Sequence, residues 1–297
     1  MKIIITGSGG FVGKNLFKYL DQRKHDVRTL SLRKSWQLDL TADVLIHLAG
    51  KAHDTSDKSD ESEYFQINYD LTRKIFEEFR TSEIRDFIYF SSVKATADTI
   101  QGVLDENHIP TPKTPYGKSK HKAEKYLLNQ ELPEGKRLFI IRPCMIHGPG
   151  NKGNLNMLYR IVDKGIPWPL ASFDNERSFL CVDNMNYLVL KMLEHKDLRS
   201  GIYNFADDEF LSTNELVLLI AQVLGRRQKM WKIPVQLIHF LVKIGDVLPL
   251  PLNAERLKKL TENYRVSNQK IKSALGIDRL PLTAQQGMKL TVKSFKN

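Results

Sequence analysis

The chain begins MKIIITGSGGFVG (residues 1–13), a short apolar run followed directly by closely spaced glycines. The run from Lys2 to Thr6 is rich in isoleucine, which is typical of a buried strand. Glycines at positions 7, 10 and 13 allow a tight turn and a close approach of the backbone to a phosphate group. A helix is expected from Phe11 to Leu20, with free N–H groups and a partial positive charge at its N-terminus. This strand–turn–helix setting predicts a site for the pyrophosphate of a dinucleotide.

Buried strands and helices alternate after this turn. The strands are predicted over residues 27–32, 44–49, 87–92 and 137–142, and the helices between them over residues 68–79 and 115–128. Strands that are apolar throughout, separated by amphipathic helices, indicate a parallel sheet with helices on both faces. The sequence therefore predicts an α/β fold built on a Rossmann-type, doubly wound parallel sheet.

The alternation ends after Gly148-Pro149-Gly150, and a proline-rich break follows at residues 165–169. Further helices are expected over residues 182–193, 214–224, 234–244 and 253–260. We predict an NAD(P)-binding Rossmann domain over residues 1–150 and a smaller, mainly helical substrate-binding part over residues 151–297. Residues 177–206 are expected to return to the Rossmann domain.

Composition narrows the class of protein. Only Cys144 and Cys181 are cysteines, so no disulfide framework is implied and a cytoplasmic protein is expected. No stretch reaches the roughly 18 apolar residues that span a bilayer. The net charge of +11 lies in residues 221–297, with 15 Lys and Arg against 4 Asp and Glu, which indicates either an anionic partner or a solvated surface. Nucleic acid and bound metal are not expected, because neither nucleic-acid-binding signatures nor zinc-ligand spacings occur.

The residues that follow the second predicted strand bear on the choice of cofactor. A dinucleotide fold normally places an acid there, which binds the adenosine ribose diol. This chain has Ser31 at that position, followed by Arg33, and these groups can bind a 2′-phosphate that a carboxylate would repel. NADP(H) is therefore favoured, with NAD(H) as the alternative if Arg33 is only a solvated loop charge. Asp39 and Leu40 are expected near the adenine amino group.

The segment Tyr116-Gly117-Lys118-Ser119-Lys120 places a phenol and an ammonium four residues apart on one helix face. A phenol with a pKa near ~10 is a poor base at neutral pH, but a nearby ammonium and a positive nicotinamide favour the phenolate. Lys120 can also bind the nicotinamide ribose. Ser92, at the carboxyl end of a predicted strand, can hold the reacting oxygen, because parallel sheets bind ligands at that edge. These three residues predict catalysis of hydride transfer.

With these motifs in this order, the chain resembles the extended short-chain dehydrogenase/reductases, the NAD-dependent epimerase/dehydratase family, whose members act on nucleotide sugars. The matching motifs run over nearly the full length: residues 6–13, His47-Leu48-Ala49-Gly50, Asn68, Ser91-Ser92, Tyr116 to Lys120, Arg142-Pro143, residues 147–154, Arg177-Ser178-Phe179, Val182-Asp183 and Tyr203-Asn204-Phe205. The chain is most similar to the UDP-glucose 4-epimerase-like branch, which includes 4-keto-sugar reductases and 4-epimerases of lipid-linked sugars.

The resemblance implies roles for particular residues. Cofactor contacts are implied for Gly7, Gly9, Gly10, Phe11, Val12, Gly13, Leu48, Ala49, Gly50, Asn68, Tyr116, Lys120 and Pro143. Asn154 and Arg177 would contact the nucleotide diphosphate or the sugar of the substrate, and Lys94 is a candidate contact for a substrate phosphate. Residues 33–43 form a shorter segment than is usual in the family, so the adenine pocket is expected to differ in detail.

Three reactions share such a site, and each begins or ends with hydride exchange at C4 of a sugar. Dehydratases of the family carry an Asp-Glu pair directly after the active-site hydroxyl, and this chain has Val93-Lys94 there, so dehydration is disfavoured. A UDP-hexose 4-epimerase and a UDP-4-keto-6-deoxyhexose reductase both remain, with a role in surface polysaccharide biosynthesis. Ser31 with Arg33 favours the reductase, whereas the branch favours the epimerase.

The C-terminal part adds further alternatives. Residues 234–244 are apolar over most of a helical circumference and lie beside the basic segment, so this helix could rest on the inner face of a membrane. The substrate would then be a lipid-diphosphate-linked sugar. The preferred interpretation is a helix buried between domains or in the interface of a homodimer, which is the expected assembly. A cofactor-binding sensor without turnover is disfavoured, because such proteins usually lose the tyrosine or the lysine.

Overall fold

The computed structural model describes residues 1–51, 60–151, 154–247 and 253–296. Its centre is a six-stranded sheet in the order β2-β1-β3-β4-β6-β9, in which every neighbouring pair is parallel. The strands are β1 (Lys2–Thr6), β2 (Asp26–Leu30), β3 (Val44–His47), β4 (Asp86–Phe90), β6 (Arg137–Pro143) and β9 (Gly201–Phe205). The predicted Rossmann-type parallel sheet is therefore confirmed.

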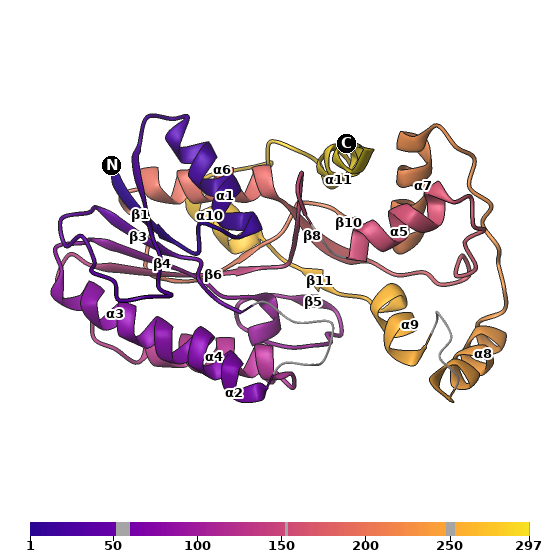
Figure 1. The fold of residues 1–297 in the computed structure, drawn as a ribbon, viewed down its shortest axis with the longest axis horizontal. Helices are drawn as coiled ribbons and strands as arrows, with labels where there is room; N and C mark the ends of the chain where they lie inside the picture. Colours follow the sequence, from indigo (N-terminus) through magenta and orange to yellow (C-terminus); the bar gives the residue numbers. More distant parts are fainter. Residues whose placement is uncertain (52–59, 152–153, 248–252, 297) are drawn as a thin grey trace.

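Helices cover both faces of this sheet (Figure 1). One face carries α1 (Phe11–Asp21), α6 (Val182–Glu194) and α10 (Gln269–Leu275); the other carries α2 (Glu61–Phe65), the π-helical turn η1 (Gln66–Asp70), α3 (Leu71–Thr81) and α4 (Pro115–Leu128). Side chains along a strand point alternately to its two faces. Ile3 and Ile5 of β1 accordingly pack in one core and Ile4 in the other. This two-sided burial explains why the strands are apolar throughout.

The remaining elements lie beside the central sheet or around a third core at the other end of the molecule (Figure 1). They are β7 (Met145–His147), β8 (Arg177–Cys181) and β10 (Phe210–Leu211) in one small sheet, β5 (Val103–Leu104) and β11 (Arg265–Val266) in another, the helices α5 (Asn154–Asp163), α7 (Thr213–Leu224), α8 (Val235–Val247), α9 (Ala254–Thr261) and α11 (Ala284–Lys293), and the short 3-10 turns η2 (Val93–Ala95) and η3 (Ser294–Lys296). Between β8 and β10 the chain returns to the central sheet as α6 and β9. The division into two domains near residue 150 stays a prediction. No helix among the described residues is long and apolar enough to cross a membrane.

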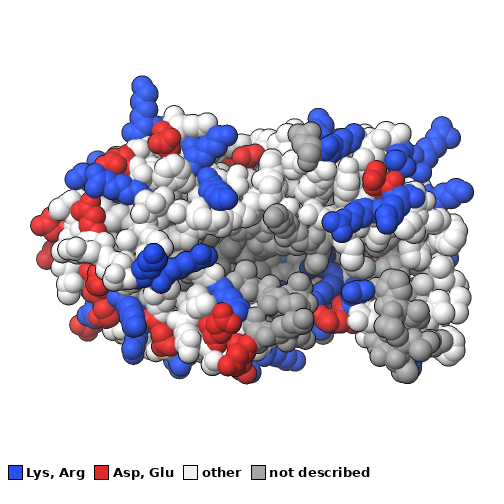
Figure 2. Space-filling view, viewed as in Figure 1, with Lys and Arg blue, Asp and Glu red and all other residues white. Residues whose placement is uncertain are grey.

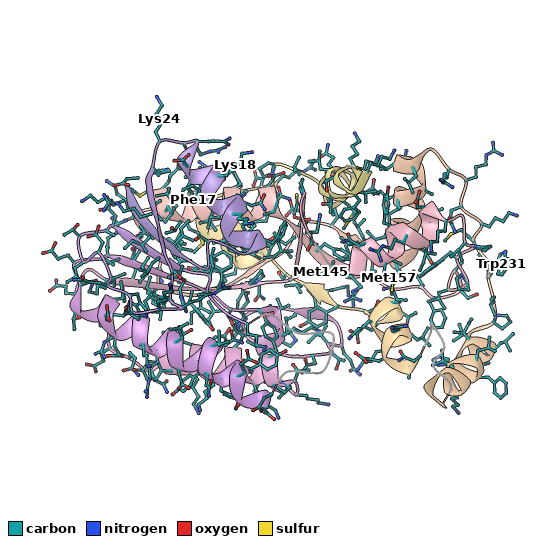
Figure 3. All side chains as sticks on the ribbon, viewed as in Figure 1. Phe17, Lys18, Lys24, Met145, Met157 and Trp231 are labelled. Carbon is teal, nitrogen blue, oxygen red and sulfur yellow. The ribbon has the colours of Figure 1, made fainter. Side chains whose placement is uncertain are left out.

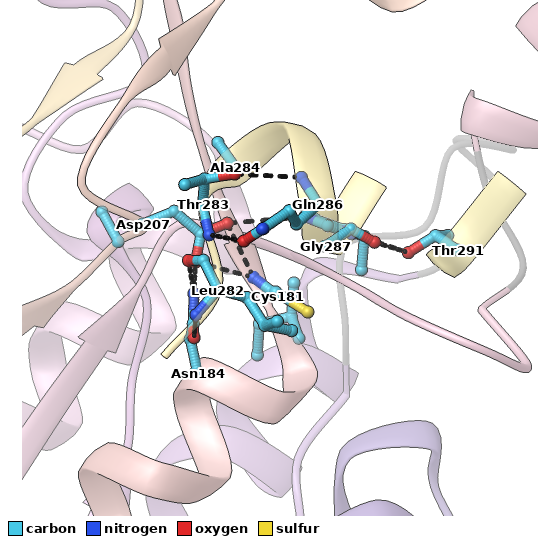
Figure 4. Close-up of polar contacts among 12 residues, drawn as sticks. Cys181, Asn184, Asp207, Leu282, Thr283, Ala284, Gln286, Gly287 and Thr291 are labelled. Atoms are coloured by element: carbon cyan, nitrogen blue, oxygen red, sulfur yellow. Dashed lines mark hydrogen bonds and ion pairs between the residues drawn. The ribbon is translucent and has the colours of Figure 1, made fainter. Parts of the chain in front are cut away.

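A buried polar network joins the start of α6 to the start of α11 (Figure 4). The Asp207 carboxylate accepts hydrogen bonds from the backbone N–H of Cys181 at 3.0 Å and from the side-chain amide of Asn184 at 2.7 Å. The Asn184 side chain also donates to the carbonyl oxygen of Leu282 at 2.8 Å and accepts from its N–H at 3.0 Å. Thr283 follows as the N-cap of α11. Because Asp207 lies just beyond β9, the network fastens α11 to the edge of the central sheet.

Strand β4 ends earlier than the sequence predicts. It stops at Phe90, although the N–H of Ser91 still donates to the carbonyl oxygen of Ile141 in β6 at 2.8 Å, and Ser92 then leaves the ladder. Ser92 becomes the N-cap of η2, and its hydroxyl accepts a hydrogen bond from the N–H of Lys94 at 3.2 Å. Serine side chains favour such local bonds to the backbone over ladder pairing. The result is a hydroxyl that stands free of the sheet at its carboxyl edge.

Two glycines of the first turn lie where a side chain would not fit. Gly7 has a φ of +69°, and a Cβ there would lie 2.6 Å from the backbone nitrogen of Ala49. A Cβ at Gly13 would lie 2.4 Å from the carbonyl oxygen of Gly7. At Gly9, by contrast, an added Cβ meets nothing within 4 Å. The packing of the turn therefore requires glycine at positions 7 and 13 but not at position 9.

Gly13→Ala is expected to destabilise the fold, with Gly9→Ala as the matched control. The new methyl group would meet backbone, which cannot swing aside, and overpacking of this kind costs about 1–3 kcal/mol. Thermal unfolding without added cofactor should show a lower midpoint for Gly13→Ala and a nearly unchanged one for Gly9→Ala. Equal midpoints for the two variants would contradict the close contact at Gly13.

Candidate active site

A cavity of about 370 Å³ opens at the carboxyl ends of β1, β3, β4 and β6, the edge at which parallel sheets bind ligands. The predicted residues on its wall are Gly7, Gly10, Phe11, Val12, Gly13, Leu48, Gly50, Ser92, Tyr116, Lys120 and Pro143. The predicted residues that are not on its wall are Gly9, Ser31, Arg33, Asp39, Leu40, Ala49 and Asn68. The wall also includes Lys51, Phe90, Ser91, Cys144 and Ile146, which the sequence analysis did not assign to the cofactor or to catalysis. Each of these adjoins a predicted residue or motif, so their places along the same loops were the available signal.

The glycine turn presents an uncapped helix N-terminus to this cavity. The N-cap of α1 is Gly10, which has no side chain to bond the first N–H groups, and the first turn contains no acidic residue. A Cβ at Gly10 would approach only the carbonyl oxygen of Gly7, at 3.4 Å. The free N–H groups and the helix dipole favour an anionic ligand here. The turn therefore fits the pyrophosphate of a dinucleotide cofactor.

Tyr116 lies in the first turn of α4, and several contacts determine where that turn begins. Thr114 is the N-cap, and its hydroxyl accepts from the N–H of Gly117 at 3.2 Å. Asp98 accepts from the N–H of Thr114 at 3.1 Å and from its hydroxyl at 2.9 Å. A Cβ at Gly117 would lie 2.5 Å from the carbonyl oxygen of Lys94, so α4 touches the backbone of η2 directly. This contact holds the two chain segments that carry Ser92 and Tyr116 side by side.

The three residues predicted to carry catalysis lie together on the wall of the cavity. The Ser92 hydroxyl lies close enough to the Tyr116 phenol to lower its pKa. The Lys120 ammonium donates to the carbonyl oxygen of Phe90 at 2.8 Å and lies 4.8 Å from the centre of the Tyr89 ring. A serine, a tyrosine and a lysine from two elements are thus gathered beside the glycine turn.

Burial shifts the titration of both the phenol and the ammonium. Burial raises the pKa of Tyr116, and the nearby Ser92 hydroxyl opposes that rise. Burial lowers the pKa of Lys120 to about 8, and the negative charge of Glu124 opposes that fall. The phenolate that the sequence analysis expects therefore depends on added positive charge, which an oxidised nicotinamide supplies when it is bound.

One helical turn beyond Lys120, Glu124 forms a buried ion pair with Arg142 of β6. The Nε and Nη2 groups of Arg142 donate to the two carboxylate oxygens at 2.9 Å and 2.6 Å. Burial alone would raise the pKa of Glu124, but its hydrogen bonds and the Arg142 charge hold that pKa below its usual value. The sequence analysis missed Glu124; the spacing of Tyr116, Lys120 and Glu124, four residues each, was the signal that could have found it.

Asn68 holds the loop beside the cavity and is not on the cavity wall. It lies buried in η1, and its amide oxygen accepts from the N–H of Lys51 at 2.8 Å. Its amide nitrogen donates to the carbonyl oxygen of Lys51 and to the hydroxyl of Ser119, both at 3.0 Å. A Cβ at Gly50 would lie 2.9 Å from the Asn68 amide oxygen and 3.1 Å from the Lys120 ammonium. The π-helical turn therefore positions the loop against Lys120, in keeping with the frequency of such turns at functional sites.

Two residues predicted to choose between the cofactors lie next to the glycine turn. Thr6 and Leu30 are paired in register at the ends of β1 and β2, so Ser31 emerges beside Gly7. The side chains of Ser31 and Arg33 are exposed. They are therefore free of the protein core at the edge where an adenosine ribose would lie.

Asp39 and Leu40 were predicted to lie near the adenine amino group, and the structure shows what each of them contacts. The Asp39 carboxylate accepts from the guanidinium of Arg28 at 2.9 Å and from the hydroxyl of Thr41 at 2.8 Å. Hydrogen bonds from Thr41 and the Arg28 charge lower the pKa of Asp39. Leu40 is exposed. Groups of the protein thus already bind the Asp39 carboxylate.

A second cavity of about 320 Å³ adjoins the first, because Cys144 lines the first cavity and Met145 the second. Side chains from α5, α7, α9 and β8 line it, and most of them are apolar. Figure 3 shows Met145 and Met157 in the region between the central sheet and the helices at the far end.

Three cations line the second cavity, namely Arg177, Arg256 and Lys259. The Arg177 guanidinium donates to the carbonyl oxygen of Lys259, and burial lowers its pKa. Lys259 is paired with Glu255, which also lies on the wall. A wall that is part apolar and part cationic suits a ligand that has a planar part and an anionic part.

Lys94 lies on the wall of neither cavity. Its ammonium donates to the carbonyl oxygen of Asp98 at 2.7 Å and lies 4.2 Å from the centre of the Tyr264 ring. Burial lowers the pKa of Lys94, and the Glu262 and Asp98 charges oppose that effect. Lys94 is therefore engaged by the protein itself. Asn154 is the first residue of α5, and its side chain lies outside the described part of the chain.

A doubly wound parallel sheet, an uncapped glycine turn and a Ser–Tyr–Lys group in one cavity define a nicotinamide-dependent enzyme that transfers hydride. Within the part of the chain that the structure describes, no cluster of His, Cys, Asp and Glu could hold a metal ion. The NAD dependent epimerase/dehydratase family matches residues 3–206, well over half of the chain. The chain belongs to this family, so the resemblance inferred from its motifs is confirmed.

Relatives align with the chain almost end to end. The UDP-glucose 4-epimerase of Vibrio cholerae is 29% identical, over 99% of this chain and 95% of that protein. The N-acetyl-alpha-D-glucosaminyl-diphospho-ditrans,octacis-undecaprenol 4-epimerase of Escherichia coli O157:H7 is 27% identical, over 98% and 94%. The structure of RMD from Pseudomonas aeruginosa complexed with NADPH has the same fold, with a TM-score of 0.75 and 22% identity over 100% and 99% of the two chains. The chain is accordingly an NAD(P)-dependent epimerase or reductase.

The buried ammonium of Lys120 should make stability depend on pH. Its pKa is about 8 in the folded chain against an ordinary value of 10.5, so between these values the unfolded state binds more protons and stability rises with pH. Lys120→Met removes this titration. The thermal midpoint of the variant minus that of the wild type should therefore fall as the pH rises from 8 to 10.

The matched control for this prediction is Lys118→Met, at an exposed lysine of the same helix. Its midpoint difference from the wild type should stay nearly constant over the same range. A constant difference for Lys120→Met as well would contradict the lowered pKa of Lys120.

Proposed function

We propose that the chain interconverts the C4 epimers of a nucleoside-diphosphate hexose bound across the two adjoining cavities. One observation carries this proposal. Ser92 and Tyr116 lie together on the wall of the first cavity, the wall continues through Cys144 and Met145, and the second cavity contains Arg177. A diphosphate bound near Arg177 would leave the attached sugar pointing towards the Ser92–Tyr116 pair.

The chemistry follows from what these side chains can hold and move. A nicotinamide cofactor bound at the glycine turn accepts and supplies the hydride. The Ser92 hydroxyl is placed to hold the C4 oxygen, and the Tyr116 phenol to take the C4 hydroxyl proton and later return it. Lys120 keeps a positive charge one helical turn from Tyr116, which favours the phenolate. Inversion also requires the sugar to present its other face between the two transfers.

Epimerisation is favoured over reduction by the relatives. Two relatives that align over 98–99% of this chain are both named as 4-epimerases. Dehydration is disfavoured by the residues after the catalytic hydroxyl, since Val93 is buried and apolar and Lys94 is bound to the Asp98 carbonyl oxygen. An acid–base pair for loss of water is therefore lacking at that position.

A 4-keto-sugar reductase that uses NADPH is the second candidate. It is supported by the exposed Ser31 and Arg33 at the end of β2, where a guanidinium can bind the 2′-phosphate. It is also supported by the fold shared with RMD, whose structure is complexed with NADPH. NADP(H) is the cofactor that we propose for either reaction.

A lipid-linked sugar is the alternative substrate. The name of the Escherichia coli relative specifies a sugar joined through a diphosphate to a polyprenol. Because both kinds of carrier contain a diphosphate, Arg177 and Arg256 could bind either one. The homodimer and the division near residue 150 are proposed with this function as well.

Product analysis separates these candidates. The purified chain is incubated with UDP-N-acetylglucosamine, and separately with its 4-keto-6-deoxy derivative, each with and without NADPH. We expect a C4 epimer, resolved by chromatography and NMR, with no net consumption of cofactor. Stoichiometric NADPH oxidation with the keto sugar alone would identify the reductase. Turnover only of an N-acetylglucosaminyl diphospholipid would identify the lipid-linked alternative.

Tyr116→Phe should lower kcat by about 10²–10⁴-fold, because it removes the group that moves the C4 proton. Cofactor binding, measured by fluorescence titration, should change little. Tyr126→Phe is the matched control, since Tyr126 lies on the same helix and its hydroxyl donates to Glu77 outside the cavity. Unchanged turnover in Tyr116→Phe would show that Tyr116 is not the catalytic acid–base.

A further inference from the structure

Helix α8 turns apolar side chains to the solvent. Leu237, Phe240 and Leu241 are 48%, 61% and 46% exposed, whereas Ile238 and Val242 are only 2% and 3% exposed. At about 100° per residue, the three exposed side chains fall within about 100° of one another, on the side opposite the two buried ones. We call Leu237, Phe240 and Leu241 the outer face of α8. The interpretation of this helix as buried between domains is therefore wrong for its outer face.

A tryptophan lies at the same end of the molecule. Trp231 is 52% exposed and belongs to the segment that joins α7 to α8 (Figures 1 and 3). Isolated exposed apolar residues are normal in folded proteins, but three on one helix face form a patch, and the exposed indole lies on the segment that leads to it. An apolar patch of this kind is typical of a surface that binds a membrane or another protein.

Cations follow one another along the segment from α7 into α8, and Asp246, near the end of α8, is the first acidic residue after them. Residues 216–245 contain no Asp or Glu, and their Lys and Arg residues are Arg226, Arg227, Lys229, Lys232 and Lys243, all exposed. Arg226 pairs with Asp163 at 3.5 Å. Within the described residues the other four make no ion pair. In Figure 2, Lys and Arg side chains gather at the upper right of the view, at the α7 end of this segment.

We propose that the outer face of α8, with Trp231 and these cations, docks on the surface of an anionic lipid bilayer. An amphipathic helix can bury its apolar side chains at the boundary between headgroups and acyl chains, where tryptophan is also favoured. Anionic headgroups attract the lysines, whose stems lie along apolar surface while their ammonium groups stay among the headgroups. The patch thus matches both the apolar layer and the charged layer of such a membrane.

The same charges argue against a second copy of the chain as the occupant. A two-fold interface places one patch against its own copy, so cations would meet cations. Between residues 216 and 245 there is no acidic residue that could compensate them. An anionic bilayer has the complementary charge.

Docking would bring the second cavity close to the membrane. Helix α8 packs against α9, and α9 supplies Arg256, Lys259 and Leu260 to the wall of that cavity. A diphosphate carried at the membrane surface would then lie near these cations. The docking itself rests on exposed side chains and does not depend on the proposed reaction.

Vesicle co-sedimentation of the full chain tests the proposal. Vesicles of phosphatidylglycerol and phosphatidylethanolamine should bind the wild type at low salt and release most of it at high salt, whereas phosphatidylcholine vesicles should bind little. Phe240→Ser/Leu241→Ser and Lys232→Glu/Lys243→Glu should each weaken binding by about tenfold or more, since they remove the apolar and the charged contacts respectively.

Two matched controls change the same kinds of residue elsewhere. Ile109→Ser removes an apolar side chain that is 84% exposed, and Lys18→Glu/Lys24→Glu reverses two exposed lysines at the opposite end (Figure 3). Both should bind vesicles as the wild type does.

Three results would overturn the docking: no binding of the wild type to anionic vesicles at low salt, equal binding to phosphatidylcholine, or full binding by the α8 variants. A change in mass by light scattering in the α8 variants, without vesicle binding by the wild type, would make this face an interface between copies. Turnover of soluble nucleotide sugar should be the same in the α8 variants and the wild type. If the wild type did not turn over soluble nucleotide sugar, this result would count against the proposed function and would not affect the docking proposal.

Discussion

Direct backbone contacts at Gly7, Gly13 and Gly117 are the constraint on which the site depends. Gly7 and Gly13 let the first turn of α1 lie against β1 and the backbone of Ala49 with no side chain between them. Gly117 does the same for α4 against η2. Both helix N-termini therefore meet the carboxyl edge of the sheet, one with free N–H groups and the other with Tyr116. Backbone contacts hold such positions closely, because they have no rotamers to exchange.

Three buried charged groups lie in a row behind the first cavity, and each one compensates the charge of its neighbour. Lys120 loses its hydration, and the Phe90 carbonyl oxygen and the charge of Glu124 compensate in part. Glu124 is itself buried and depends on Arg142. Pairs of this kind add little net stability compared with apolar packing, yet losing one partner costs about 3–5 kcal/mol. Their place next to Lys120 gives them a role in keeping the cofactor-facing ammonium charged.

In the proposed function, the first cavity carries out the reaction and the second cavity determines which substrate binds. In the proposed reaction, the groups of the first cavity hold the cofactor and move the proton, and an epimerase and a reductase need the same groups. The second cavity and the outer face of α8 come from the part of the chain that follows β6. The two parts are joined at Tyr264, whose hydroxyl donates to the carbonyl oxygen of Ala97 at 2.7 Å, just beyond η2.

Local sequence patterns were enough to predict the parallel sheet, the glycine turn and the grouping of Ser92, Tyr116 and Lys120. Apolar runs indicate buried strands. Residues that follow parallel strands lie at the same edge of the sheet. The pairing of Glu124 with Arg142 and the open outer face of α8 could be learned only from the tertiary structure. The apolar periodicity of a helix indicates which side chains favour burial. Whether another segment covers those side chains depends on how distant parts of the chain pack. That packing buried one side of α8 and left the other to the solvent.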